Sequence, residues 1–308
     1  MPGSPRRPRA DTTARPDMSQ APAGRVEGAR IFLAGHRGMV GSAIYRKLRL
    51  LGHDSERILT RPRADLDLRD RAQVEAALSQ ERPDIVILAA ARVGGIGANQ
   101  RRPAEFIHDN LAIQSNVIHS AHLAGVPRLL FIASSAIYPR HAAQPMSEEA
   151  LLNGALDPSH EPYAVAKIAG LKMCESYNRQ YGRDYRSVVP TNLFGPGDNF
   201  HPEDAHVLPA LVRRFHEAVE RGEEQLTLWG TGTPRREFLH VDDMADAALF
   251  VLGLDPATHA SATRPMQGHI NVGTGRDISI RALADIVAEV TGFSGRIETD
   301  PARPDGAP

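Results

Sequence analysis

The chain has 308 residues, with 36 basic and 37 acidic side chains, a formal net charge of −1 and 42% hydrophobic residues. A chain of this size and composition buries a core, and at roughly 150 residues per domain it forms about two domains. The near-neutral charge gives no indication of a nucleic-acid partner, and no apolar run reaches the roughly 18–20 residues that span a bilayer. The single cysteine, Cys174, excludes a disulfide-stapled domain and a cysteine-based zinc cluster. We therefore expect a cytoplasmic globular protein with no nucleic-acid, membrane or metal partner.

Residues 1–28 mix proline, arginine, glycine and alanine without an apolar period, which predicts a flexible tail. The arginine content also fits an organelle transit peptide, but Asp11 and Asp17 argue against that alternative.

From residue 29 to residue 190, short β-rich runs alternate with amphipathic helical stretches. The predicted strands are Ile31–Leu33, Ile58–Leu59, Ile85–Ala90, Leu129–Ala133 and Ser187–Val189, and the helices are Val40–Leu51, Arg71–Leu78, Ala104–Leu123 and Tyr163–Tyr181. Continuous apolar strands that alternate with helices are typical of right-handed βαβ units and a parallel sheet covered on both faces. The pattern predicts an α/β fold with a doubly wound parallel (Rossmann) sheet.

The segment after Pro190 is rich in glycine, proline, asparagine, aspartate and histidine, and polar loops of this kind often carry ligand contacts. Its predicted elements are a helix near His206–Gly222, a helix over Asp242–Leu254, a strand over His269–Val272 and a helix over Ser279–Thr291. We predict a smaller C-terminal substrate-binding lobe beside the Rossmann domain. The Rossmann domain covers residues 29–190, with 237–265 returning to it, and the lobe covers 191–236 and 266–308.

The loop after the first predicted strand, AGHRGMVGSAI, contains Gly35, Gly38 and Gly41 directly before the first helix. Glycines at this spacing allow a tight turn and close approach of the backbone to a pyrophosphate, which the helix N-terminus attracts. The loop therefore predicts a dinucleotide site, to which Met39 and Val40 also belong.

The choice of nicotinamide cofactor depends on the second strand, which ends without the acid that binds the ribose in NAD sites. Arg61 and Arg63 follow it instead, and Arg37 lies in the glycine loop. Guanidinium groups suit a 2′-phosphate because they donate bidentate, charge-assisted hydrogen bonds. We expect NADP(H) rather than NAD, with Asp67 and Leu68 at the end of a further strand in contact with the adenine.

Tyr163 and Lys167 are four residues apart on a predicted helix and share one face. An ammonium beside a phenol lowers the tyrosine pKa from its usual value near 10, which suits proton transfer to a carbonyl. Ser134 ends the strand LLFIASS at the edge where a cofactor binds, and its hydroxyl can hold the substrate oxygen. We predict that Ser134, Tyr163 and Lys167 are catalytic, and that Cys174 is a packing residue.

These three residues resemble the Ser–Tyr–Lys triad of the short-chain dehydrogenase/reductase superfamily, in its extended branch that acts on nucleotide sugars. From about residue 30 onward the chain is similar to the GDP-L-fucose synthases, on the segments AGHRGMVGSAI, AAARVGGI, EPYAVAKIAGLKMCESYNRQYGRDYRSVVPTNLFGPGDNFHPEDAH and PRREFLHVDDMA. The resemblance implies a multifunctional oxidoreductase and isomerase of GDP-L-fucose biosynthesis. Such an enzyme epimerises GDP-4-keto-6-deoxy-D-mannose at C3 and C5 and then reduces C4 with NADPH.

The resemblance also implies roles for residues of the lobe. His206 would be the acid of the epimerisation, and the GDP-sugar site would be lined by Asn192, His206, Arg214, Trp229 and Arg236. Two departures bear on this. Ala136 stands where the family motif SSCIYP has its cysteine base, so we expect an impaired epimerase step. The family also continues past the PDG segment, so we expect a lobe truncated at its C-terminus.

The two long helices carry apolar residues on more than one stripe, which predicts a homodimer with a four-helix interface; these residues are Ile118, Leu123, Ile168, Leu171 and Met173. Two alternatives to the proposed activity remain open. One is another nucleotide-sugar enzyme of the same branch, such as a 4-epimerase or a 4-reductase. A 4,6-dehydratase is not among these alternatives, because SSAIYP lacks the Thr-Asp-Glu pattern of that enzyme. The other is a catalytically impaired NADP-binding module.

Overall fold

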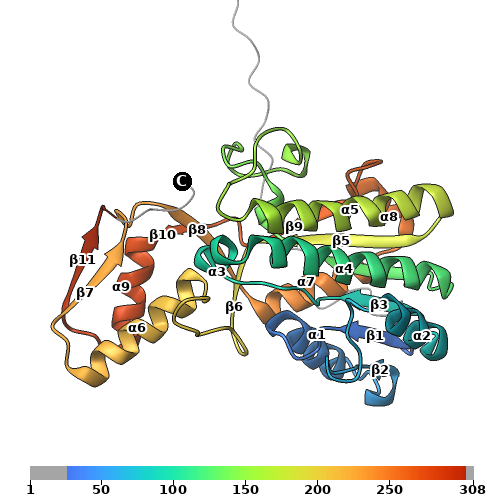
Figure 1. Ribbon diagram of the computed structural model, residues 1–308, viewed down its shortest axis with the longest axis horizontal. Coiled ribbons are helices and arrows are strands. Elements are labelled where there is room, and N and C mark those ends of the chain that lie inside the picture. The colour runs from blue at the N-terminus through green and yellow to red at the C-terminus, as the bar shows by residue number, and fades with distance from the viewer. Residues whose placement is uncertain (1–25, 303–308) are drawn as a thin grey trace, which may run out of the picture.

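The computed structural model describes residues 26–302, and Figure 1 shows a sheet covered by helices with a smaller lobe beside it. Most of the predicted tail, residues 1–25, lies outside the described residues. Val26 falls within the predicted tail but is buried in a core cluster with Ile31 and Ile58. The packed part of the chain therefore begins earlier than the composition predicted, because one valine can bury itself against the first two strands.

The central sheet has six parallel strands in the order β2-β1-β3-β4-β5-β9. Their bounds are β1 Ile31–Ala34, β2 Ile58–Leu59, β3 Ile85–Leu88, β4 Arg128–Ile132, β5 Asp184–Pro190 and β9 His269–Val272. The chain leaves β1 on one side to form β2 and returns on the other side to form β3, so strand order reverses between β1 and β3. Ligands bind at such a switch point in doubly wound sheets. The predicted α/β Rossmann fold is confirmed.

One boundary of the predicted lobe is wrong. Strand β9 lies within the range 266–308 that we assigned to the lobe, but it pairs with β5 from Ser187↔His269 to Pro190↔Val272. The four residues of β9 include too few apolar side chains to show from the sequence whether the strand belongs to the central sheet or to the lobe. The pairing with β5 shows that it is an edge strand of the central sheet.

Helices cover both faces of the sheet (Figure 1). One face packs against α2 (Arg71–Glu81), α4 (Pro103–Leu123) and α5 (Glu161–Tyr181), whose buried residues form one apolar cluster with the sheet. The other face packs against α1 (Met39–Leu50) and α7 (Val241–Gly253), which form a second cluster. No helix among residues 26–302 is long and apolar enough to cross a membrane.

The lobe has its own core, made by α6 (Val207–Arg221), α9 (Ile280–Thr291) and the parallel pair β7 (Gln225–Trp229) and β11 (Arg296–Asp300). A three-stranded sheet has the strand order β10-β8-β6. Its strands are β10 (Asp277–Ser279), β8 (Arg235–His240) and β6 (Asn192–Phe194). Two short helices complete the fold, α3 (Ile96–Arg101) and α8 (Pro256–Ala262). The polar loops that we predicted after residue 190 therefore contain several short strands, which pair over long sequence distances.

The stripe of residues predicted to form a dimer interface is only partly at the surface. Ile118, Ile168 and Leu171 are buried in the cluster between the helices and the sheet, and Met173 packs against the same cluster. Leu123, by contrast, is 57% exposed. Because α4 and α5 lie against each other as well as against the sheet, their inward faces are wider than one stripe, and our reading of these positions as outward was wrong.

Candidate active site

A large cleft is lined by residues at the carboxyl ends of β1, β3, β4 and β5 and by residues of the lobe. Its lining contains every site residue predicted from the sequence except Gly41, which is buried in the first turn of α1. The fold therefore brings together residues from the first strand, the fourth strand, α5 and the lobe.

The glycine loop fits a dinucleotide because side chains cannot occupy its tightest points. A Cβ on Gly35, whose φ is +89°, would lie 2.6 Å from the backbone nitrogen of Ala90, and a Cβ on Gly41 would lie 2.1 Å from the carbonyl oxygen of Gly35. Helix α1 begins after Gly38 with no side-chain cap and no acid in its first turn. Its N-terminal N–H groups and positive dipole end therefore suit the charge of a pyrophosphate.

Three predicted arginines, Arg37, Arg61 and Arg63, line the cleft beside the glycine loop. Arg61 forms an ion pair with Glu81 at the end of α2, which holds its guanidinium in place. Their charge fits the 2′-phosphate that distinguishes NADP from NAD.

Asp67 and Leu68 line the same cleft but not at the end of a strand, as we predicted. They lie in the connection between β2 and α2, because the Asp67 carboxylate accepts from the backbone N–H of Arg69 at 3.0 Å and turns the chain there. Hydrogen bonds from Arg69 also lower the pKa of Asp67 to about 2.

The three predicted catalytic residues lie close together at the end of β4. Ser134 follows the strand and accepts a hydrogen bond from the N–H of Ala136 at 3.3 Å. Lys167, which is 4% exposed, donates from Nζ to the carbonyl oxygen of Ile132 at 2.8 Å, and the same nitrogen lies 6.0 Å from the centre of the Tyr163 ring. Because these contacts come from a strand end and a helix, the group is held on rigid elements.

The protonation states differ from our prediction. Burial lowers the pKa of Lys167 to about 7, and burial raises the pKa of Tyr163 to about 12, against the effect of a hydrogen bond with Ser134. The prediction that the lysine lowers the tyrosine pKa was wrong, because burial disfavours the charged form of each group and outweighs the hydrogen bond with Ser134 at Tyr163. Tyr163 is therefore a neutral phenol that can donate a proton at neutral pH.

The residues of the lobe form the opposite wall of the cleft. His206 is the N-cap residue of α6. Burial lowers the pKa of its imidazole, although the negative charge of the Asp198 carboxylate acts in the opposite direction. Asn192 donates to the carbonyl oxygen of Glu237 at 3.0 Å, and Arg214 donates to that of Thr227 at 2.6 Å. Trp229 and Arg236 complete this wall, and the indole of Trp229 is 63% exposed.

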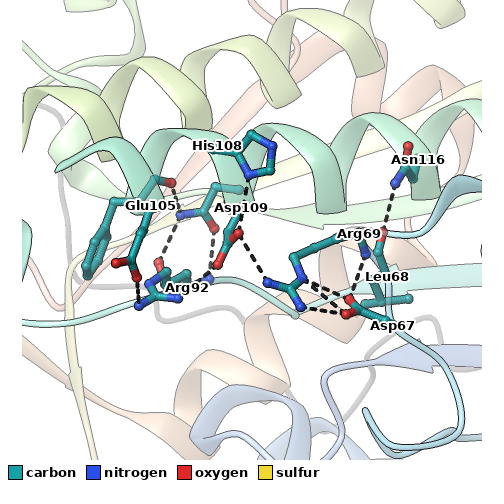
Figure 2. Close-up of polar contacts among 10 residues, drawn as sticks. Asp67, Leu68, Arg69, Arg92, Glu105, His108, Asp109 and Asn116 are labelled. Carbon is teal, nitrogen blue, oxygen red and sulfur yellow. Dashed lines mark hydrogen bonds and ion pairs between the residues drawn. The ribbon is translucent and has the colours of Figure 1, made fainter. Parts of the chain in front are cut away.

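Several polar residues beside the cleft were missed in the sequence. Figure 2 shows Asp109 of α4 between two arginines, Arg69 and Arg92, that belong to different loops. The available signal was the polar spacing on α4, since Asp109 and Asn116 are seven residues apart and share a helix face. The described part of the chain contains no group of three or more histidine, cysteine or acidic residues placed to hold a metal ion.

A doubly wound sheet, a glycine loop at its switch point and an adjacent Ser–Tyr–Lys group together define a dinucleotide-dependent short-chain dehydrogenase. The chain belongs to the NAD dependent epimerase/dehydratase family, which residues 31–273 match.

Three relatives illustrate the likeness. The chain is 57% identical to the GDP-L-fucose synthase of Escherichia coli (strain K12), over 91% of this chain and 86% of that one. It is 54% identical to GDP-L-fucose synthase 1 of Arabidopsis thaliana, over 92% and 84%. Its fold matches the structure of a GDP-mannoheptose C4 reductase from Campylobacter jejuni with NADP bound, with a TM-score of 0.79, 37% identity and coverage of 88% and 86%.

Proposed function

We propose that this protein is an NADPH-dependent epimerase and reductase that converts GDP-4-keto-6-deoxy-D-mannose to GDP-L-fucose. The observation that carries the proposal is the cleft itself, which has the Ser134, Tyr163 and Lys167 group on one wall and His206 on the other. High identity to GDP-L-fucose synthases over nearly the whole chain supports the same substrate and product.

The residues present fit NADPH. The glycine loop and the N-terminus of α1 would hold the pyrophosphate, Arg37, Arg61 and Arg63 would hold the 2′-phosphate, and Asp67 and Leu68 would contact the adenine. When bound, this cofactor supplies the hydride that reduces C4 of the sugar.

The protein's own part in the reduction is to deliver a proton to the C4 oxygen. Tyr163 is protonated at neutral pH because its pKa is about 12, and the hydroxyl of Ser134 is placed to hold the same oxygen. After the proton leaves, the ammonium form of Lys167 stabilises the phenolate, and the Ile132 carbonyl keeps its nitrogen in position.

The epimerisation requires a base and an acid on opposite faces of the sugar. His206 supplies an acid group on the lobe wall. Ala136, which lines the cleft two residues after Ser134, has no titratable atom at the position of the family's cysteine. We therefore propose that epimerisation at C3 and C5 is slow in this chain while reduction at C4 is retained.

Ala136 also favours a second candidate, a C4 reductase of a GDP-sugar that releases the unepimerised sugar. The similarity to a GDP-mannoheptose C4 reductase is consistent with this reaction. A 4-epimerase and an impaired NADP-binding module are the remaining alternatives.

The test is NADPH oxidation with GDP-4-keto-6-deoxy-D-mannose, followed by identification of the product. GDP-L-fucose supports the full activity, and the C4-reduced but unepimerised sugar supports the second candidate. Absence of NADPH oxidation contradicts both, and interconversion at C4 without net consumption of cofactor identifies a 4-epimerase.

We further propose that the protein acts in the cytoplasm as a homodimer. Helices α4 and α5 still present exposed side chains, including Leu123, Val165 and Tyr181, which a second copy could cover. Light scattering at micromolar concentration tests this, and a monomeric mass contradicts it.

A further inference from the structure

Asp109 receives hydrogen bonds from two arginines of separate loops. Arg92 Nη1 donates to one carboxylate oxygen at 2.9 Å, and Arg69 Nη1 donates to the other at 3.4 Å. The aspartate is 8% exposed and lies on α4, which packs against the sheet. Figure 2 shows the carboxylate between the two guanidinium groups.

The first loop lies on the side of the cleft that we assign to the cofactor. Arg69 forms a paired contact with Asp67, with Nε 3.0 Å from one oxygen and Nη2 2.6 Å from the other. Asn116 of α4 donates to the carbonyl oxygen of Leu68 at 3.0 Å. Helix α4 therefore holds this loop through both Asp109 and Asn116.

The second loop leads to the substrate wall. Asn110 accepts from the backbone N–H of Arg92 at 2.9 Å and donates to its carbonyl oxygen at 2.9 Å. Three residues further on, the N–H of Gly95 donates to the carbonyl oxygen of Asp204 at 2.9 Å. Asp204 is two residues before His206, so the position of this loop bears on the acid of the lobe wall.

An arginine of each loop pairs with the same negative charge, the carboxylate of Asp109. Burial alone would raise the pKa of this carboxyl group, but hydrogen bonds from Arg92, His108 and Arg69 outweigh it and leave the pKa lowered. Glu105 also pairs with Arg92, but it does not contact Arg69, so among the residues in Figure 2 only Asp109 joins the two guanidinium groups. Removing one partner of such a partly buried charge pair leaves the other poorly satisfied.

We propose that Asp109 is a positioning residue that couples the cofactor wall to the substrate wall of the cleft. Its carboxylate ties Arg69 and Arg92 to α4, so a change at Arg92 alters how well the Asp67–Arg69 loop binds NADPH. The inference rests on the proposed function in one respect, namely that this loop faces the cofactor.

The test is a double-mutant cycle on the dissociation constant for NADPH, measured by fluorescence titration. Arg69→Gln and Arg92→Gln are made singly and together, in the wild-type and in the Asp109→Asn background. We expect the double variant to differ at least about threefold from the product of the single effects when Asp109 is present. In the Asp109→Asn background the two effects should multiply. An aspartate with a purely structural role would couple the two arginines in the free energy of unfolding but not in the dissociation constant for NADPH.

Glu105→Gln is the matched control, since it removes a carboxylate from Arg92 without touching Arg69, and its NADPH affinity should stay within about twofold of wild type. If Asp109→Asn does not fold, the cycle with Asp109 intact still decides, because independent effects of the two arginines overturn the inference. A wild-type chain that binds no NADPH overturns the proposed function and the inference with it. Binding with independent effects overturns the inference alone.

Discussion

The two walls of the cleft differ in how much water their functional groups contact. On the sheet wall, Lys167 is almost fully buried, and its pKa and that of Tyr163 are displaced in opposite directions by the loss of water. On the lobe wall, the indole of Trp229 is largely exposed, but burial also lowers the pKa values of His206, Arg214 and Arg236. The comparison shows that loss of water shifts the pKa of groups on both walls, and that the large shifts fall on Tyr163 and Lys167, the pair that we propose carries the reduction.

The largest effect is expected where the walls must act together, at Ala136. Ala136→Cys adds a titratable thiol, and a general base typically contributes about 10²–10⁴-fold in rate. We expect deuterium incorporation at C3 and C5 of the substrate in D₂O to rise by about this factor, while Ala136→Ser, of similar size, stays near the alanine form. Fast exchange in the unchanged protein would mean that His206 or a bound water is the base.

The next effect concerns the rigidity of the sheet wall. Gly41→Ala places a Cβ 2.1 Å from the Gly35 carbonyl oxygen, so the backbone must shift, and we expect the free energy of unfolding to fall by about 3 kcal/mol or more. In Gly38→Ala the new Cβ lies 3.4 Å from the same oxygen, and the loss should be about 1 kcal/mol or less. Urea unfolding without added cofactor compares the two, and equal losses would contradict the steric argument.

A smaller effect follows from the buried lysine. The folded pKa of Lys167 is about 7 and its ordinary value is 10.5, so between these values the unfolded chain binds a proton that the folded chain lacks. Stability therefore rises with pH in this window, and the destabilising contribution is fully present below pH 7. From pH 6.5 to pH 9 the group adds about 2.5 kcal/mol to the free energy of unfolding of the wild type.

Lys167→Met removes this titration. Urea unfolding at the two pH values should show the gap between the variant and the wild type changing by that amount. Lys47→Met, a partly exposed lysine of α1 paired with Asp246, is the control and should follow the wild type. If the free energy of unfolding of the wild type and that of Lys167→Met change with pH in parallel, burial does not lower the pKa of Lys167.

The sequence predicted contacts within one short segment better than contacts between distant segments, for a physical reason. Tyr163 and Lys167 are related by one helical turn, and the glycine loop is read from seven consecutive residues. Asp109 meets Arg92 and Arg69 across 17 and 40 positions of the chain, and the strands of the lobe pair over similar or longer distances. Spacing also carries no information on burial, which is why the pKa of Tyr163 was predicted in the wrong direction.

The smallest effect tests the charge at the rim of the sheet wall. We expect NADPH to bind at least about tenfold more tightly than NADH, because loss of one guanidinium–phosphate hydrogen bond costs about 1.5–3 kcal/mol. Arg61→Ala should therefore weaken NADPH binding about tenfold and leave NADH binding unchanged, whereas Arg57→Ala, whose guanidinium donates to the Gly28 carbonyl, should change neither. Because Arg61 is paired with Glu81, its removal also leaves that carboxylate, which Arg30 contacts at 3.6 Å, beside the proposed 2′-phosphate site. Glu81→Gln in the Arg61→Ala background should then recover part of the NADPH affinity, and equal affinity for both cofactors in the wild type would contradict the assignment.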